Sequence, residues 1–310
     1  MDSRSKRKLA ARERHGDGRQ RTGHQIYPFA RVVITGSVRP GNMPATSFDD
    51  CAAPVQKTMM AQQHANSDAN VDPAEIARFA RLADDWWNPH GKFKPLHKLG
   101  PARLGFIRDA ATRHFKLPLR GMKPLTGLSI LDIGCGGGLI AEPLSRLGAA
   151  VTGIEPTDAN IGAARQHAKA TGLIIDYRAV SAEDLADENR TFDMVVCLEV
   201  VEHVPAPAAF IKVCATLVRP GGLLILSTIN RTPKAYLLAI VGAEYVLRWL
   251  PVGTHTWERF ITPVELDSHV RAANLEALDC QGLVFNPLTD QWSLGRDTDV
   301  NYIGAAAKPL

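Results

Sequence analysis

The sequence predicts an α/β fold: a doubly wound, mostly parallel sheet of seven strands with helices on both faces and an N-terminal helical lid. Short apolar runs alternate with segments of helical periodicity from residue 128 onward. Most of these runs are apolar at nearly every position, which is typical of parallel strands buried on both faces. Right-handed crossovers between successive strands then give the doubly wound layout.

The stretch 128–155 carries the first half of this fold. It contains an apolar run at 128–133, a glycine-rich turn, a helical pattern at 139–147 and a β-branched run at 151–154 that ends on Glu155. Glycine suits the turn because a Cβ would keep the backbone away from a ligand lying across the carboxyl end of the strand. Glu155 can accept hydrogen bonds from both hydroxyls of a ribose. Around the turn, the expected contacts with such a nucleoside are Asp132, Gly134, Gly136 and Gly138.

The spacing of the glycines decides which nucleoside fits. The dinucleotide fingerprint requires G-x-G-x-x-G, and Leu139 stands where its third glycine belongs. A pyrophosphate needs the exposed N–H groups of a helix N-terminus, whereas S-adenosylmethionine has no phosphate and presents an ammonium and a sulfonium. Asp132, just before the turn, suits a cation. The pattern therefore favours S-adenosylmethionine and argues against a dehydrogenase; the alternative is a turn that binds no ligand.

Two helical patterns precede the first strand and are expected to cover its carboxyl end. The first spans 73–87, and the second spans 101–115 with Arg103 on its apolar face. The loop between them is rich in aromatic, basic and proline residues and begins with Trp86 and Trp87. Adjacent side chains on a helix end cannot share one face, so we expect at least one tryptophan to cover a ligand. The alternative is a pair that closes the edge of the core.

The remaining elements follow from the same patterns. Helices are expected at 156–171, 207–218, 233–250 and 263–273, and a short polar turn at 181–185. Strands are expected at 173–177, 192–198, 223–228, 275–285 and 300–306, the last two as a hairpin-like pair.

The strand at 192–198 is followed by Glu199, Glu202 and His203, which would lie beside the glycine turn. If this stretch turns into a helix, the three side chains share one face. They could then hold Mg²⁺ together with waters, or His203 and Glu202 could serve as a general base and its orienting acid. A buried histidine with a purely structural role is the third alternative.

The first sixty residues and the rest of the chain carry net charges of opposite sign. Residues 1–60 hold eleven Lys and Arg against five Asp and Glu, a net charge of +6, so the whole-chain value of +4 leaves −2 for the rest. We expect residues 1–69 to be a disordered basic extension, with a natural start at Met59 or Met60 as an alternative, and a nucleic-acid-binding or targeting arm as another. Residues 70–310 are expected to form one domain. Its acidic balance argues against a nucleic-acid partner.

The apolar segment 236–250 carries only Glu244 and Arg248 as charges. It is too short to span a bilayer but apolar enough to lie at its surface. We expect the region 236–260 to make reversible contact with membrane lipid, and packing into the core is the alternative.

Several of these segments resemble the ubiquinone-biosynthesis O-methyltransferases, which methylate polyprenyl catechols and polyprenyl demethylubiquinols. The similarity covers about residue 70 to the C-terminus. The motifs that carry it are W-W-N-P-H-G-K-F-K-P-L-H-K-L-G-P-A-R-L at 86–104, L-D-I-G-C-G-G-G at 131–138, C-L-E-V-V-E-H-V-P at 197–205, S-T-I-N-R-T-P-K at 227–234, and the later V-G-A-E-Y, N-P-L-T-D and D-V-N-Y. The resemblance implies the Rossmann-like fold of class I S-adenosylmethionine-dependent methyltransferases.

The resemblance also implies site residues. Cofactor contacts are implied at Arg103, Gly134, Glu155 and Leu198, and the metal-dependent members place an ion on E-x-x-E-H, matched by Glu199, Glu202 and His203. Glu183, in the polar turn, is a further candidate cofactor contact. Glutamate at position 155 is a departure, since aspartate is also common there; it changes reach but not charge.

From the resemblance we expect methyl transfer from S-adenosyl-L-methionine to a phenolic hydroxyl of 2-polyprenyl-6-hydroxyphenol and 3-demethylubiquinol. The alternative is a methyltransferase of the same fold that acts on another small phenol or carboxylate. A cytoplasmic location, peripheral on the inner face of the membrane, and a ubiquinone-synthesis complex as partner are the accompanying expectations.

Overall fold

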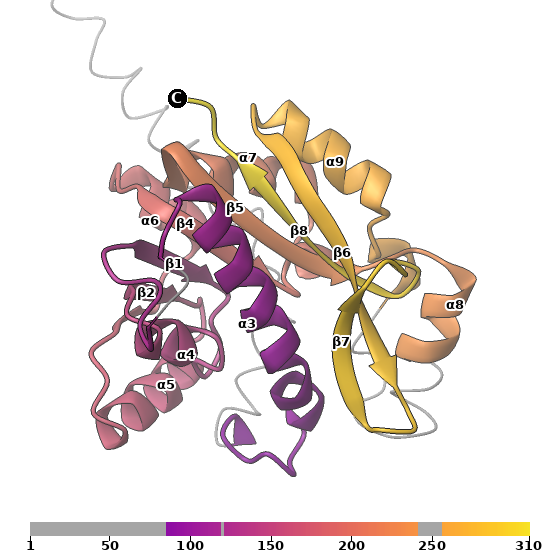
Figure 1. Cartoon of the computed structure of the whole chain (residues 1–310), viewed down its shortest axis with the longest axis horizontal. Helices are drawn as coiled ribbons and strands as arrows, with labels where there is room; N and C mark the ends of the chain where they lie inside the picture. The colour runs from indigo at the N-terminus through magenta and orange to yellow at the C-terminus, as the bar shows by residue number, and fades with distance from the viewer. Residues whose placement is uncertain (1–84, 119–120, 241–255) are drawn as a thin grey trace, which may run out of the picture. The chain divides into compact units, whose positions relative to one another are not determined.

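The computed structural model describes residues 85–118, 121–240 and 256–310, and these residues build one mixed sheet of eight strands (Figure 1). The strand order is β3-β2-β1-β4-β5-β8-β6-β7, in which β1 to β5 are parallel and the other three are antiparallel to their neighbours. The strands are β1 Ser129–Ile133, β2 Ala150–Ile154, β3 Asp176–Arg178, β4 Phe192–Leu198, β5 Val218–Ile229, β6 Glu276–Asn286, β7 Gln291–Gly295 and β8 Asn301–Ala307.

The predicted count of seven strands was one too low. Strand β6 extends beyond its pairing with β8, turns back and pairs with β7 from Gly282 to Asn286. The sequence of β7, Q-W-S-L-G, has no apolar run, because only Trp292 and Leu294 face the protein interior. It becomes a strand because its partner continues past β8, which a local pattern does not record.

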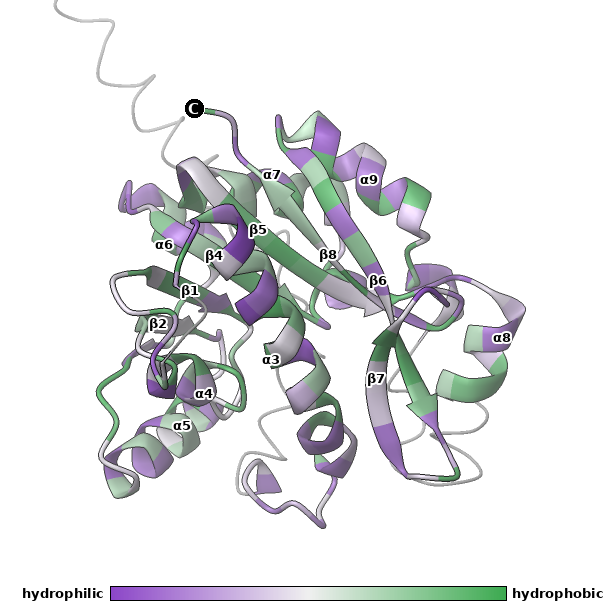
Figure 2. Cartoon of the chain, viewed as in Figure 1, coloured by the Kyte–Doolittle hydropathy of each residue, from purple (hydrophilic) through white to green (hydrophobic). Residues whose placement is uncertain are grey.

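Helices cover both faces of the sheet. The helices are α3 Lys94–His114, α4 Ala141–Arg146, α5 Asp158–Ala170, α6 Ala182–Asp187, α7 Pro207–Leu217, α8 Pro233–Ala235 and α9 Pro263–Ala272, with short 3-10 turns η3 Val201–His203 and η5 Trp257–Arg259. One large core joins the sheet to α3, α4 and α5, and the other joins it to α6, α7 and α9. Figure 2 shows β4, β5 and β8 coloured hydrophobic over most of their length, whereas α3, α5 and α9 alternate. The doubly wound prediction is confirmed.

Several local boundaries differ from the prediction: β3 is Asp176–Arg178 in place of 173–177, and β5 begins at Val218 in place of residue 223. Two further differences have a local cause. The polar turn expected at 181–185 is the helix α6, because Ser181 accepts from the backbone N–H of Asp184 while the Asp184 carboxylate accepts from that of Ser181. The helix expected from Pro101 begins at Lys94 and carries Pro101 inside it. A proline often marks the first helical turn, and here Pro95 does so instead.

The sheet register places the site at one edge. Ile133 at the end of β1 is aligned with Ile154 of β2 and with Cys197 of β4. The next residues along the chain are Gly134, Glu155 and Leu198, so they lie at the same level of the carboxyl edge. Strand order reverses between β1 and β4, and ligands of open α/β sheets bind at such a reversal.

Some expectations fall on residues outside the described ranges. These are the extension at 1–69, the starts at Met59 and Met60, the helix at 73–87 except for its last three residues, and the apolar segment beyond residue 240. Across the described residues, no helix combines the length and the apolar character that a bilayer crossing requires.

Candidate functional site

The glycine turn between β1 and α4 holds a tight backbone that only glycine tolerates. The N–H groups of Gly134 and Cys135 both donate to the carbonyl oxygen of Ile154, at 2.9 and 3.0 Å. Gly134, Gly136 and Gly138 have φ of +69°, +51° and +92°, in the region that side chains disfavour. The turn is therefore pinned to β2, and its outer surface is bare backbone.

The tryptophan pair, Trp86 and Trp87, packs on that bare backbone. A Cβ at Gly136 would lie 2.3 Å from the Trp86 ring, and one at Gly137 would lie 2.4 Å from it. Trp87 Nε1 donates to the carbonyl oxygen of Gly137 at 2.9 Å. The segment before α3 thus lies over the turn, as the predicted lid requires, and both tryptophans take part.

Asp132 sits beneath the turn with an unsatisfied carboxylate. It is 3% exposed, and its Oδ2 has no hydrogen-bond partner among the described residues. Burial raises the pKa of Asp132 to about 7, against the hydrogen bond from the Ala141 backbone and the charge of Arg103, which lower it. A buried carboxylate with a free oxygen fits a cationic ligand, because the positive charge would offset the cost of ionising it.

Glu155 follows β2 on the other side of the turn. It is half-buried, and burial raises its pKa, whereas the nearby Thr157 and Asn160 lower it. Asn160 Nδ2 lies 3.4 Å from Glu155 Oε1, a long contact that leaves the carboxylate room for other donors. This acid is placed for the two hydroxyls of a ribose, as the sequence predicts.

Arg103 reaches the site from α3. Its side chain is 4% exposed, and its Nη2 lies 3.0 Å from Oε1 of Glu199. That distance makes an ion pair, but Nε and Nη2 form no hydrogen bond of good geometry in the described chain. Arg103 is therefore a buried cation with donors to spare, which fits a carboxylate ligand.

Glu199 directly follows β4 and has a left-handed conformation, with φ of +55°. Its carboxylate accepts from Ser227 Oγ at 2.7 Å and faces Arg103. A glutamate in this region carries local strain of about 1 kcal/mol or more, and such residues gather at functional sites. The side chain that leaves this residue meets β5 at Ser227 and α3 at Arg103.

Glu202 and His203 lie in the short turn η3. Glu202 is 3% exposed and accepts from Thr228 Oγ1 at 2.8 Å, while its Oε1 has no partner in the described chain. Burial and the charge of Glu199 raise the pKa of Glu202, and the neighbouring His203 lowers it. His203 is half-buried beside it.

These three residues do not share a helix face. The 3-10 turn has only three residues and Glu199 precedes it in a left-handed conformation, so the expected i, i+3 and i+4 spacing is not formed. The described residues contain no group of three His, Cys, Asp or Glu side chains placed to hold a metal ion. Arg103 pairs with Glu199 and Thr228 bonds one oxygen of Glu202, whose Oε1 keeps no partner in the described chain, so the three side chains would have to rearrange to hold Mg²⁺.

Leu198 and Glu183 complete the predicted set. Leu198 is 9% exposed at the end of β4, and Glu183 is half-buried in the first turn of α6, which follows β3. Glu183 is thus at the far side of the carboxyl edge, two strands from β1.

The sequence analysis missed three polar residues at this edge. Tyr177 is 3% exposed with an unpartnered hydroxyl, against which a Cβ at Gly138 would lie 2.2 Å away. Thr157 Oγ1 is likewise buried and unpartnered, and Asn160 Oδ1 accepts from Trp86 Nε1 at 2.9 Å. Thr157 and Asn160 follow Glu155 within about one helical turn, and that proximity was the available signal.

Comparisons with known proteins agree with this geometry. A family model described as a methyltransferase domain matches residues 131–226. A ubiquinone biosynthesis O-methyltransferase of Rhizobium etli is 53% identical over 241 residues, covering 78% of this chain and 97% of the relative. One from Parvibaculum lavamentivorans is 52% identical over 240 residues, covering 77% and 95%.

Solved structures show the same fold at low sequence identity. The magnesium protoporphyrin IX methyltransferase of Synechocystis PCC 6803, solved with bound SAH, is 18% identical with a TM-score of 0.51, covering 79% of this chain and 99% of that one. A possible histamine N-methyltransferase of Thermotoga maritima is also 18% identical with a TM-score of 0.51, covering 76% and 99%.

Fold and site together define a class I methyltransferase whose methyl donor is S-adenosylmethionine. Within that class, the chain belongs to the family of the ubiquinone biosynthesis O-methyltransferases.

Proposed function

We propose that this chain transfers the methyl group of S-adenosylmethionine to a phenolic hydroxyl of 2-polyprenyl-6-hydroxyphenol and of 3-demethylubiquinol. The observation that carries the proposal is the buried, unpaired carboxylate oxygen of Asp132 under the glycine turn. It calls for a positive charge that the surrounding protein does not fully supply. Relatives that share about half of their residues with this chain are named for ubiquinone biosynthesis, which supports the substrate class.

The cofactor would be held by residues from five segments of the fold. Arg103 would take the methionyl carboxylate with its spare donors, and the backbone of Gly134, Gly136 and Gly138 would face the sulfonium end, on the side where Val200, Trp86 and Tyr177 pack in the unliganded fold. The ribose hydroxyls would bond Glu155. Leu198, at the end of β4, would pack at the edge of the ligand, and Glu183 would lie at its far end.

The reaction is an in-line displacement. The phenol oxygen attacks the methyl carbon, the carbon–sulfur bond breaks, and S-adenosylhomocysteine leaves with the bonding electron pair. Most of the rate gain would come from holding the two reactants in line. A phenol has a pKa of about 10, so a base that removes its proton would help, and His203, next to the buried Glu202 in η3, is our candidate for that role.

The decisive experiment pairs a binding assay with a turnover assay. Calorimetry should show that the protein binds S-adenosylmethionine and not nicotinamide dinucleotides, and a short-tailed polyprenyl catechol should be methylated on oxygen. If the protein binds S-adenosylmethionine and methylates another small phenol but not that catechol, the substrate belongs to a different class from the one proposed. No affinity for S-adenosylmethionine would remove the proposal.

A metal requirement is tested on the same protein. Turnover is measured after treatment with a chelator and again after Mg²⁺ is restored. Because Arg103 already pairs with Glu199 and Thr228 donates to one oxygen of Glu202, we expect unchanged turnover. A loss that Mg²⁺ reverses would mean that the three residues rearrange around an ion when substrate binds.

We further propose that the region 236–260 contacts membrane lipid, so that the protein collects a substrate with a polyprenyl tail at the inner face of the membrane. In the described part of this region Tyr236, Leu237 and Leu238 are 47, 59 and 55% exposed, a run of apolar surface next to β5. Vesicles containing anionic lipid should carry the protein upward in a flotation gradient. A double change of Leu237 and Leu238 to Gln should reduce that flotation without lowering cofactor affinity, and equal flotation would contradict the proposal. A complex with other ubiquinone-synthesis proteins is part of the same hypothesis.

A further inference from the structure

Trp87 is bonded directly to the cofactor turn. Its indole N–H donates to the carbonyl oxygen of Gly137, 50 residues away in sequence, at 2.9 Å. That carbonyl lies between Gly136 and Gly138, both of which have positive φ. Glycine-rich backbone has the largest conformational freedom of any segment, so a donor from outside the turn restricts which way its peptide planes face.

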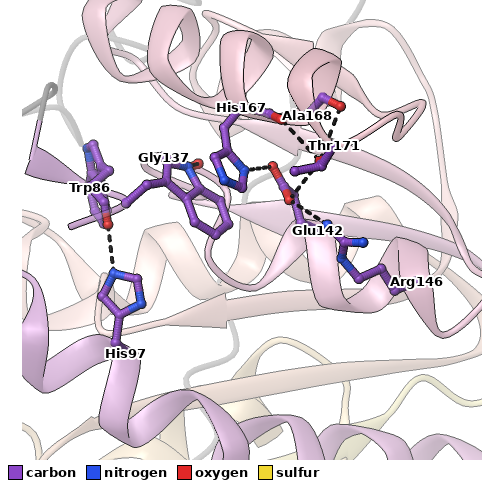
Figure 3. A network of polar contacts seen from close by, with 9 residues as sticks. Trp86, His97, Gly137, Glu142, Arg146, His167, Ala168 and Thr171 are labelled. Atoms are coloured by element: carbon purple, nitrogen blue, oxygen red, sulfur yellow. Dashed lines mark hydrogen bonds and ion pairs between the residues drawn. The ribbon is translucent and has the colours of Figure 1, made fainter. Parts of the chain in front are cut away.

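The Trp87 indole is itself held by His167 on α5. The two rings are stacked, with centroids 3.5 Å apart and planes within 7°. The Nδ1 of His167 lies 2.7 Å from Oε1 of Glu142, and Figure 3 shows this contact within a polar network that includes Thr171 and Arg146. The imidazole is thereby locked in the orientation that presents its flat face to the indole.

Glu142, which contacts His167, is also hydrogen-bonded to the glycine turn. It stands in the first turn of α4, and its backbone N–H donates to the carbonyl oxygen of Gly138 at 3.0 Å. Its side chain is 1% exposed, and its shortest polar contact is the one with His167. The contacts with Thr171 and Arg146 are longer, at 3.4 and 3.5 Å. A buried carboxylate is costly unless it is paired, so Glu142 and His167 specify each other's position.

The neighbouring tryptophan reaches the ribose side of the same site. Trp86 Nε1 donates to Asn160 Oδ1 at 2.9 Å, and Asn160 in turn faces Glu155. His97 Nε2 donates to the carbonyl oxygen of Trp86 at 2.8 Å, which ties the pair to the first turns of α3, the helix that also brings Arg103. The two tryptophans therefore join the lid to both cofactor-binding elements.

We propose that Trp87 is a positioning residue for the cofactor, held through the chain Glu142–His167–Trp87–Gly137, and that it sets the glycine turn in the shape that binds S-adenosylmethionine. This inference rests on the proposed function. It adds three side chains that lie outside the predicted cofactor contacts, and it assigns them an effect on cofactor affinity, with no part in the chemical step.

The test uses Trp87→Phe, which keeps a ring on His167 but removes the N–H to Gly137. We expect the Kd for S-adenosylmethionine, by calorimetry, and the KM for it to rise about five- to tenfold, the value of one hydrogen bond. At saturating cofactor, kcat should stay within about twofold. Trp292→Phe is the matched control, because the Trp292 N–H has no partner in the described chain, and it should leave both constants unchanged.

A second pair of variants tests the relay from Glu142. Glu142→Gln keeps an acceptor for His167 and should retain most of the affinity, whereas Glu142→Leu combined with His167→Phe removes the polar contact but keeps an apolar stack. That double variant should weaken cofactor binding, and adding Trp87→Phe to it should weaken binding by less than Trp87→Phe does alone. If Trp87→Phe does not fold, the affinities of Glu142→Gln and of the double variant decide the question, and a double variant that binds as tightly as the wild type would contradict the positioning role.

The outcomes separate this inference from the proposed function. If the wild-type chain does not bind S-adenosylmethionine, the proposed function fails. If the wild type binds and Trp87→Phe binds equally well, or if Trp87→Phe lowers kcat with an unchanged Kd, the positioning role is wrong while the function stands.

Discussion

Replacing Asp132 by asparagine removes a carboxyl group whose pKa lies near neutrality and which sits beneath the cofactor turn. In the unfolded chain this carboxyl has a pKa near 3.8, and in the fold burial raises the pKa to about 7. Since each pKa unit corresponds to about 1.4 kcal/mol, the ionised form is disfavoured in the unliganded fold by about 4 kcal/mol above pH 7. An asparagine side chain at this position would have the same shape and no charge to bury.

The sign of the pH dependence follows from the raised pKa. A carboxyl of this kind contributes stability that is fully present below pH 3.8 and is lost as the pH rises through about 7. The free energy of unfolding of Asp132→Asn should therefore exceed that of the wild type by about 2 kcal/mol at pH 5.5 and by about 4 kcal/mol at pH 8. Urea unfolding of both proteins at the two pH values, without cofactor, measures it.

Bound cofactor should favour the wild type, in contrast to the unliganded proteins, of which Asp132→Asn is expected to be the more stable. The cation of S-adenosylmethionine favours ionised Asp132, so the wild type should bind about tenfold more tightly at pH 8 than at pH 6, and should be stabilised by ligand accordingly. In Asp132→Asn this pH dependence should flatten and the affinity should fall. An equal stability difference at pH 5.5 and pH 8, or an unchanged affinity profile in the variant, would refute the reasoning about this buried carboxylate.

Asp193 provides a control of opposite sign. Partial burial raises the pKa of Asp193, but hydrogen bonds from Ser129 and the contact with Arg219 outweigh burial, so the pKa is lowered overall. It therefore contributes stability that is present above its unfolded pKa and is lost as the pH falls through the lowered value. Asp193→Asn should destabilise the fold at pH 8 and less so in acid, whereas Asp132→Asn should stabilise it at pH 8.

Three further outcomes are expected at the site. Gly138→Ala should lower the free energy of unfolding by about 2–4 kcal/mol, because its Cβ would meet the Tyr177 hydroxyl at a positive φ; if Gly138→Ala combined with Tyr177→Phe unfolds no later than Gly138→Ala alone, the clash is not with that hydroxyl. His203→Ala should lower turnover at least tenfold and leave the Kd for S-adenosylmethionine nearly intact, and unaltered turnover would remove His203 from the mechanism. Arg103→Gln should raise that Kd at least tenfold and leave Glu199 without its cation, so an unchanged Kd would assign Arg103 to structure alone.

Much of the fold could be predicted because its signals are local. The uniform apolar runs, the glycine turn after β1 and the acid after β2 depend on neighbouring residues, and the sheet register then brings Gly134, Glu155 and Leu198 to one edge. The eighth strand had no such signal, because β7 exists through its pairing with β6. The start of α3 was misplaced because Pro101 resembles a first-turn proline and lies instead within the helix.

The cluster after β4 shows why sequence spacing alone does not decide how side chains are arranged. The sequence spacing of Glu199, Glu202 and His203 allows one helix face, and the chain forms only a three-residue turn after a strained residue. What decides their orientation is the set of partners that reach them from Arg103 and Thr228, neither of which is near in sequence.

By itself, the sequence determined the alternation of strands and helices, the turn that only glycine can make, and the acids on either side of it, because each depends on backbone preference and burial within a few residues. The tertiary structure alone decided that Trp87 bonds Gly137, that Trp86 bonds Asn160, and that Arg103 faces Glu199. These contacts join segments 50 to 96 residues apart, and they form only once helices from distant parts of the chain have packed on the sheet with their side chains in fixed directions.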